Sequence, residues 1–142
     1  MKIIHFDFQR RVRYFEVDKM GYVHNSNVFR YFENGREETM RHFGLSYFDI
    51  EKQGVMMPLV EQYCHYHIPA AYDDLITIRT TIKAMPTAKI RFDYEIFSIK
   101  NCNKVLNYEG FNILCFVDLV SRKPMRCPNF IKEFFEKILS NR

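Results

Sequence analysis

Apolar residues alternate with polar ones at the start of the chain, and this pattern predicts a first strand over residues 3–17. The alternation is carried by Phe6, Phe8, Val12 and Tyr14. The segment that follows, residues 18–27, is polar and contains Gly21, which is typical of a loop.

A helical period begins after this loop and extends from Val28 to Phe43. One stripe recurs every three or four residues, through Phe29, Phe32, Arg36, Met40 and Phe43. Suitable N-caps precede the stripe and Gly44 is a suitable stop; the caps are Asn25, Ser26 and Asn27. A glycine inside a helix costs about 1 kcal/mol relative to alanine, so we expect Gly35 to be kept because a sheet presses closely on the helix.

The remaining sequence predicts a short helix, four strands and a terminal helix. Ser46 is expected to cap the short helix, which covers residues 46–53 and ends at Gly54. The strands are predicted at residues 57–69, 75–85, 89–99 and 105–120, and the terminal helix at 129–139. In the strand at 57–69 neither face is cleanly polar, so we expect both of its faces to be covered.

Consecutive strands joined by short turns indicate an antiparallel sheet, so the predicted class is α+β. The sequence contains no internal repeat and no linker, and we therefore expect residues 1–142 to form one domain. One helix against one sheet leaves apolar surface uncovered, and we expect a second copy of the chain to complete its burial.

The composition excludes several classes of protein. It is 47% hydrophobic and 27% charged, which argues against disorder, and no apolar run reaches the length of roughly 20 residues that spans a bilayer. The start of the chain lacks a signal-peptide pattern, and four scattered cysteines suggest reduced thiols, so we expect a cytoplasmic protein. The net charge of +4 suits a polyanionic small ligand more than nucleic acid.

The most informative chemistry lies where the loop meets the helix. Asp18 precedes the helix start by a few residues, and free backbone N–H groups collect at such a start. A carboxylate facing amide donors suits acyl transfer, because the carboxylate attacks or activates water while the amides receive the developing oxyanion.

The segment from Asp18 to Arg36 resembles a known signature. The pattern Asp18-x-x-Gly21-x-Val23-His24-Asn25-x-x-Val28-x-x-Tyr31-Phe32-Glu33-x-x-Arg36 is similar to that of the hotdog-fold acyl-CoA thioesterases of the 4-hydroxybenzoyl-CoA thioesterase-like family. The resemblance in element order covers residues 6–120. It implies one hotdog domain, with an antiparallel sheet curled around one long central helix, followed here by a short C-terminal helix.

The resemblance also implies an activity, which is hydrolysis of an acyl thioester to a free acid and a thiol without a cofactor or metal. By the resemblance, Asp18 acts as nucleophile or general base, and the helix amide near Asn25 polarises the thioester carbonyl. Some members carry Tyr-His where this chain has His24-Asn25, so Asn25 cannot take a proton role that such a histidine has. His24 is a further catalytic candidate, on the condition that its ring faces the site. The residues expected to bind substrate are Gly21, Val23, Val28 and Glu33, with Lys89 and Arg91 facing the coenzyme phosphates.

Several alternatives remain open at this point. The substrate is expected to be an acyl-CoA, with an acyl-carrier-protein thioester or a non-catalytic binding role as alternatives. The family implies a homodimer or a homotetramer, and the sequence does not choose between them or identify the acyl group. Glu33 and Arg36 are also spaced as a helix ion pair, which would be a purely structural role. His65 and His67 share a strand face but have no further metal ligands at matching positions.

Overall fold

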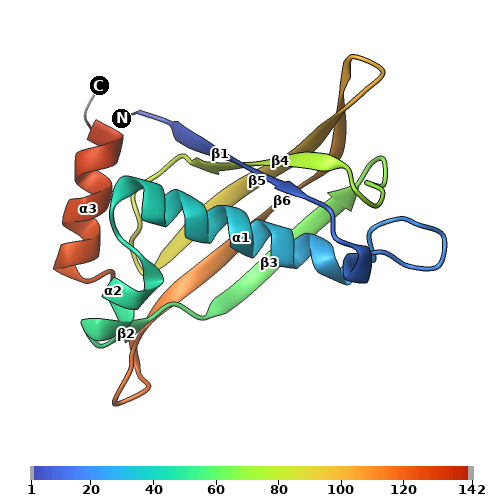
Figure 1. Ribbon diagram of the computed structural model, residues 1–142. Coiled ribbons are helices and arrows are strands. Elements are labelled where there is room, and N and C mark those ends of the chain that lie inside the picture. The colour runs from blue at the N-terminus through green and yellow to red at the C-terminus, as the bar shows by residue number, and fades with distance from the viewer. Residues whose placement is uncertain (1, 141–142) are drawn as a thin grey trace.

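The computed structural model describes residues 2–140 and shows a long helix packed on one face of an antiparallel sheet (Figure 1). The sheet has seven strands in the order β1-β4-β5-β6-β2, and β3 and β7 also pair with β6. The strands are β1 (Ile4–Arg11), β2 (Val55–Met56), β3 (Leu59–Tyr66), β4 (Leu75–Ile82), β5 (Lys89–Lys100), β6 (Asn103–Asp118) and β7 (Pro124–Met125). The helices are α1 (Ser26–Phe43), α2 (Tyr47–Lys52) and α3 (Asn129–Ser140). This arrangement confirms the predicted α+β class.

The central helix α1 is positioned by its apolar stripe. Its buried residues face the sheet, and they include Val28, Tyr31, Phe32 and Met40. Phe32 stacks on Tyr94 of β5 with ring centroids 4.4 Å apart. The sheet supplies the other half of this core through alternate residues of β4 and β5, because every second side chain of a strand points to the same face.

The closest approach of helix and sheet occurs at Gly35, as the sequence predicts. A Cβ atom built on Gly35 would lie 2.5 Å from Ile78 Cγ2 and 2.7 Å from Thr80 Oγ1, both on β4. Any side chain at this position would therefore push α1 away from the sheet.

The ends of α1 and α2 largely follow the sequence signals. Gly44 adopts φ 105°, a left-handed conformation, and its N–H returns to the carbonyls of the last turn. Ser46 caps α2 by accepting a hydrogen bond from the Asp49 N–H at 3.1 Å. The start of α1 lies two residues earlier than predicted, at Ser26.

The first strand is shorter than its composition suggests. It ends at Arg11, and a single turn of 3-10 helix follows at Tyr14–Glu16. The prediction of a strand through residue 17 was therefore wrong. The chain turns here because the Glu16 side chain points inward, where its carboxylate accepts a hydrogen bond from the Arg13 N–H at 2.9 Å.

Strand β3 lies at an edge of the sheet, because β6 is its only partner among the described residues. Seven of its eight residues are exposed, so the expectation that both faces are covered does not hold within one chain. The pairing register shifts between Leu59 and Glu61, which places Leu59 on the same face as Cys64 and Tyr66, whereas strict alternation along the strand would place it on the opposite face. Its exposed apolar residues leave an edge that can pair with another chain.

Two other features complete the architecture. The terminal helix α3 buries Ile131, Phe135 and Leu139, and the Lys2 N–H donates to the Leu139 carbonyl at 2.8 Å, so both ends of the described chain lie together (Figure 1). Within residues 2–140, no helix is long and apolar enough to cross a membrane.

We predict that Gly35→Ala destabilises the protein. Because a Cβ at this position would make two contacts below 3 Å, the overpacking cost lies in the upper part of the usual range, at about 2–3 kcal/mol. The gain in helix propensity returns about 1 kcal/mol, so the free energy of unfolding should fall by about 1–2 kcal/mol. Urea denaturation measures this change. The control is Arg30→Ala on the exposed side of α1, which should change stability by less than about 0.5 kcal/mol. Equal stability of the glycine and alanine proteins would contradict the close packing.

Candidate functional site

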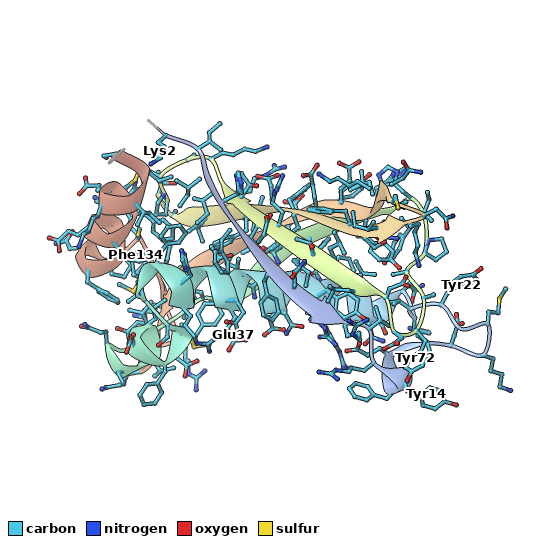
Figure 2. All side chains as sticks on the ribbon, turned by 45° about the horizontal axis from the view of Figure 1, so that its top comes forward. Lys2, Tyr14, Tyr22, Glu37, Tyr72 and Phe134 are labelled. Atoms are coloured by element: carbon cyan, nitrogen blue, oxygen red, sulfur yellow. The ribbon has the colours of Figure 1, made fainter. Side chains whose placement is uncertain are left out.

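Asp18 lies in a loop that projects from one end of the molecule. Tyr14, Tyr22 and Tyr72 gather at this end, opposite Lys2 and Phe134 (Figure 2). The Asp18 side chain is exposed, and its Oδ1 accepts hydrogen bonds from the N–H groups of Met20 at 2.9 Å and Tyr22 at 3.3 Å. Among the described residues nothing donates to its Oδ2, so one carboxylate oxygen is fixed and the other is available.

The loop is closed at its base by antiparallel pairing. Val17 forms an isolated β-bridge with Val23, and the His24 N–H donates to the Glu16 carbonyl at 2.9 Å. These bonds place the residues that precede Asp18 opposite those that precede α1. Gly21 allows the return of the chain through φ 86°, a left-handed value that other residues rarely adopt. The base of the loop that carries Asp18 is therefore joined to the residues that precede α1.

The start of α1 offers a free amide. His24 Nδ1 lies 3.2 Å from the Ser26 N–H and 2.8 Å from Ser26 Oγ, so the imidazole replaces the expected caps. The Asn25 side chain makes no cap bond, and no hydrogen bond within residues 2–140 uses the Asn25 backbone N–H. Its carbonyl instead accepts from the Tyr66 hydroxyl at 3.2 Å. An unpaired N–H at the positive end of an 18-residue helix can stabilise an oxyanion.

Glu16 ties this region to the core, and sequence reasoning did not find it. The residue is only 6% exposed. Its carboxylate pairs with Arg10 Nη2 at 2.5 Å and accepts from the Tyr31 hydroxyl at 2.9 Å. Burial and this hydrogen bond to Glu16 hold the pKa of Tyr31 well above its usual value, so the phenol stays protonated and remains a donor.

The same residue is connected through its backbone. The Glu16 carbonyl accepts from Asn27 Nδ2 at 2.8 Å as well as from the His24 N–H. Arg10 reaches across to Asn34 Oδ1 at 2.6 Å and lies over the Tyr31 ring, 4.7 Å from its centroid. Strand β1, the loop base and α1 therefore converge on one buried carboxylate, which fixes where the Asp18 loop begins.

Two of the predicted substrate-binding residues lie inside the core. Val28 is fully buried and Val23 is 7% exposed, and the Val23 N–H donates to the Ala70 carbonyl at 2.9 Å. Packing therefore accounts for both valines of the motif: Val23 packs at the base of the loop and Val28 packs beneath α1.

The predicted ion pair between Glu33 and Arg36 is not formed. The Arg36 guanidinium donates instead to the hydroxyls of Tyr47 and Tyr94, the latter at 3.3 Å. Among the described residues neither Glu33 nor Arg36 takes part in an ion pair. Glu33 is exposed and Arg36 is buried, and both border a groove beside the helix.

Lys89 and Arg91 lie on the face of the sheet that points away from α1. Their neighbours Ile90 and Phe92 point into the core, so these cations alternate outward. Arg91 pairs with Asp93 at 3.0 Å and lies 3.9 Å from the centroid of the Phe111 ring. Within one chain the structure does not bring these cations to Asp18.

The cysteine and histidines of β3 and the residues after it do not form a second catalytic centre with Asp18 among the described residues. Burial raises the pKa of the Cys64 thiol to about 11, so Cys64 is not a ready thiolate nucleophile. His67 Nε2 pairs with Glu109 at 2.7 Å on the outer face, where the His65 ring lies 4.2 Å from that of His67.

The chain is similar to known thioesterases in both sequence and structure. The profile of the Thioesterase-like superfamily matches residues 12–135. A protein of Aquifex aeolicus named "Putative esterase" is 36% identical over 92 residues, which are 65% of this chain and 72% of that protein. The acyl-CoA thioester hydrolase YbgC of Escherichia coli is 28% identical over 127 residues, or 89% of this chain and 92% of the other. The DHNA-CoA thioesterase of Staphylococcus aureus superposes with a TM-score of 0.86 at 25% identity, covering 96% of this chain and 91% of that one.

We predict that Glu16→Gln strongly destabilises the protein. The substitution keeps the shape of the side chain but leaves the partly buried Arg10 charge without a carboxylate, which should lower the free energy of unfolding by about 3 kcal/mol. Chemical denaturation measures the loss. A matched control is Asp7→Asn, which removes the carboxylate of the exposed Arg79–Asp7 pair and should cost about 0–1 kcal/mol. Similar losses in the two variants would show that Glu16 has no special anchoring role.

Proposed function

Because the chain belongs to the thioesterase-like superfamily and has its hotdog fold, we propose that it hydrolyses acyl-CoA thioesters to a free acid and a thiol. One observation carries the proposal. The Asp18 carboxylate has an oxygen available, and the base of its loop is joined to the segment that leads into α1, where the Asn25 N–H is unpaired. A thioester held between these groups would have its carbon exposed to the carboxylate and its oxygen directed at the amide.

Two routes fit this arrangement. In the first, an Asp18 oxygen attacks the carbonyl carbon, the carbon–sulfur bond breaks, and the resulting mixed anhydride is hydrolysed by water. In the second, Asp18 accepts a proton from a water molecule as the water oxygen adds to the same carbon, and the thiolate then leaves. In both routes the Asn25 N–H stabilises the negative charge on the carbonyl oxygen, and the carboxylate is regenerated.

His24 has a defined part in this proposal. Its Nδ1 faces the Ser26 N–H, which makes Nδ1 the acceptor and leaves the proton of the neutral ring on Nε2. The Nε2–H is therefore the donor that can approach the leaving sulfur. We assign substrate positioning, and not proton abstraction, to His24.

The proposed assembly is a homodimer formed through the edge strand β3, with a homotetramer as a further step. The exposed edge presents Leu59, Val60, Tyr63 and Tyr66, and pairing with a second copy would cover this apolar surface. In a dimer, Lys89 and Arg91 of one copy can bind the phosphates of a coenzyme whose thioester lies in the site of the other copy. We place the protein in the cytoplasm on the strength of its cysteine content and composition.

An acyl-carrier-protein thioester is the second candidate substrate, since its reacting thioester is the same. A non-catalytic thioester-binding role is the third. The available Asp18 oxygen and the unpaired Asn25 amide favour catalysis over binding alone, since binding does not require a nucleophile beside an oxyanion site.

We predict that Asp18→Asn lowers kcat for acyl-CoA hydrolysis by about 100-fold or more, because the amide can neither attack nor accept a proton. A thiol-release assay over a panel of acyl-CoA substrates measures the effect. Asp118→Asn is the matched control, because the Asp118 Oδ1, at the end of β6, likewise accepts hydrogen bonds from two backbone N–H groups that follow it, those of Val120 at 2.9 Å and Ser121 at 2.8 Å. Unchanged turnover in Asp18→Asn would exclude Asp18 as the catalytic group.

We predict that Lys89→Ala raises KM for acyl-CoA substrates several-fold and leaves kcat unchanged, because a cation near the coenzyme phosphates strengthens ground-state binding. The KM of the parent should also increase with salt. N-acetylcysteamine thioesters, which lack phosphate, are the control and should show neither effect. An equal KM increase on these truncated substrates would rule out phosphate recognition by Lys89.

A further inference from the structure

A groove of about 340 Å³ is lined by residues of α1, of the edge strand β3 and of β6. Helix α1 contributes Phe29, Arg30, Glu33 and Arg36. The rest of the lining comes from the strands and the segment before β3, namely Met57, Leu59, Gln62, Asn112 and Leu114. Phe29 is four residues beyond Asn25, so the groove lies along the helix face that begins at the proposed oxyanion site. If the proposed function is correct, this groove is where an acyl group would extend.

Arg36 is an unusual residue to find in such a groove. It is 8% exposed, yet its hydrogen-bond partners are the neutral hydroxyls of Tyr47 and Tyr94, and no carboxylate lies within 4.0 Å of its nitrogens among the described residues. A buried charge is costly unless an opposite charge accompanies it. The guanidinium is therefore held in place but not neutralised.

Free hydrogen-bond donors also face the groove. The Tyr94 hydroxyl donates to Asn112 Oδ1 at 2.8 Å, and the Asn112 amide N–H groups have no acceptor among the described residues. The N–H groups of Arg36 Nη2 also have no acceptor there, because the guanidinium donates to the tyrosines through its other nitrogens. The only fully buried side-chain N or O atom without a partner in residues 2–140 is Thr80 Oγ1, so these donors must reach open space. That space is the groove which both residues line.

The balance of charge in the groove is positive. Arg30 is exposed at its rim and has no ion pair within the described chain, and Arg36 adds a second positive charge against the single carboxylate of Glu33. Glu51 lines an adjoining cavity together with Tyr47, and Arg36 and Glu33 border both cavities. A plain hydrocarbon chain would contact the apolar part of the groove but would leave the Arg36 charge and the Asn112 amide without an acceptor.

We propose that this groove selects acyl groups that carry a carboxylate, so that the substrates are monothioesters of dicarboxylic acids. Arg36 and Arg30 supply the charge partners, and the Asn112 amide supplies a further donor. The helical rise of 1.5 Å per residue places Arg30 and Arg36 about 7 and 16 Å from Asn25 along the helix axis. The terminal carboxylate of a medium-length acyl group therefore comes level with Arg30, and the Arg36 side chain can approach it because side chains of a helix tilt toward its N-terminus. The proposal rests on the proposed function and adds the substrate class.

The test compares two thioesters of equal length, suberyl-CoA and octanoyl-CoA, which differ in the terminal carboxylate. The parent dimer or tetramer should hydrolyse suberyl-CoA with a kcat/KM at least about tenfold higher. Arg36→Met should abolish this preference. Arg30→Gln, which alters only an exposed residue, should reduce the preference several-fold through a higher KM for suberyl-CoA. Glu33→Gln should increase the preference, because it removes the opposing charge.

The control variant is Arg41→Gln, which lies on the same helix but pairs with Glu38 and Glu37 outside the groove and should leave the preference unchanged. A thermal melt verifies that Arg36→Met is folded. Equal or faster hydrolysis of octanoyl-CoA by the parent would overturn the proposal, as would equal losses on both substrates in Arg30→Gln. Absence of turnover on any thioester would count against the thioesterase function itself, which separates the two failures.

Discussion

The buried carboxylate of Glu16 is the constraint on which the candidate site depends. It binds Arg10 from β1, Tyr31 from α1 and the backbone of Arg13, and its own carbonyl receives His24 and Asn27. Because these contacts fix both ends of the Asp18 loop, the loop is short, closed and anchored to the central helix. A carboxylate that must reach a thioester needs such an anchor, since small displacements of a catalytic group cost much of its effect.

The packing of α1 on the sheet provides the second condition. Gly35 lets the helix approach β4 closely, and Phe32 stacks on Tyr94, so the helix axis and its N-terminus have one position relative to the strands. The same packing presents Arg36 to the tyrosines beneath it and to the groove beside it. The site and the groove therefore share one rigid support, while the exposed edge strand β3 forms the groove's other wall.

Much of this arrangement could be read from local sequence. The period of α1, the stop at Gly44, the cap at Ser46 and the alternation in β5 are local signals, and the structure confirms them. Glu16 was missed because it lies in a run of residues with strand composition. Its side chain points inward because it binds Arg10 and Tyr31, and neither contact is visible in the local alternation of that run. A buried acid near an arginine in such a run is the signal that could have revealed it.

Other errors also arose from contacts that a local pattern does not contain. Glu33 and Arg36 are spaced as an ion pair, but Tyr47 and Tyr94 compete for the guanidinium from α2 and β5. Strict alternation fails at Leu59 because the register shift between Leu59 and Glu61 is set by pairing with β6, which the strand's own sequence does not show. The alternation in β5 placed Lys89 and Arg91 on one face, but only the packed structure shows that this face points away from α1.

The proposed mechanism requires a thioester carbonyl to lie between Asp18 and the Asn25 N–H. A crystal structure of the Asp18→Asn protein with a bound acyl-CoA would show where this carbonyl lies. We expect the carbonyl oxygen about 3 Å from the Asn25 nitrogen, with the residue-18 side chain facing the carbonyl carbon. A thioester bound elsewhere, such as on the outer face of the sheet beside Arg91, would contradict it.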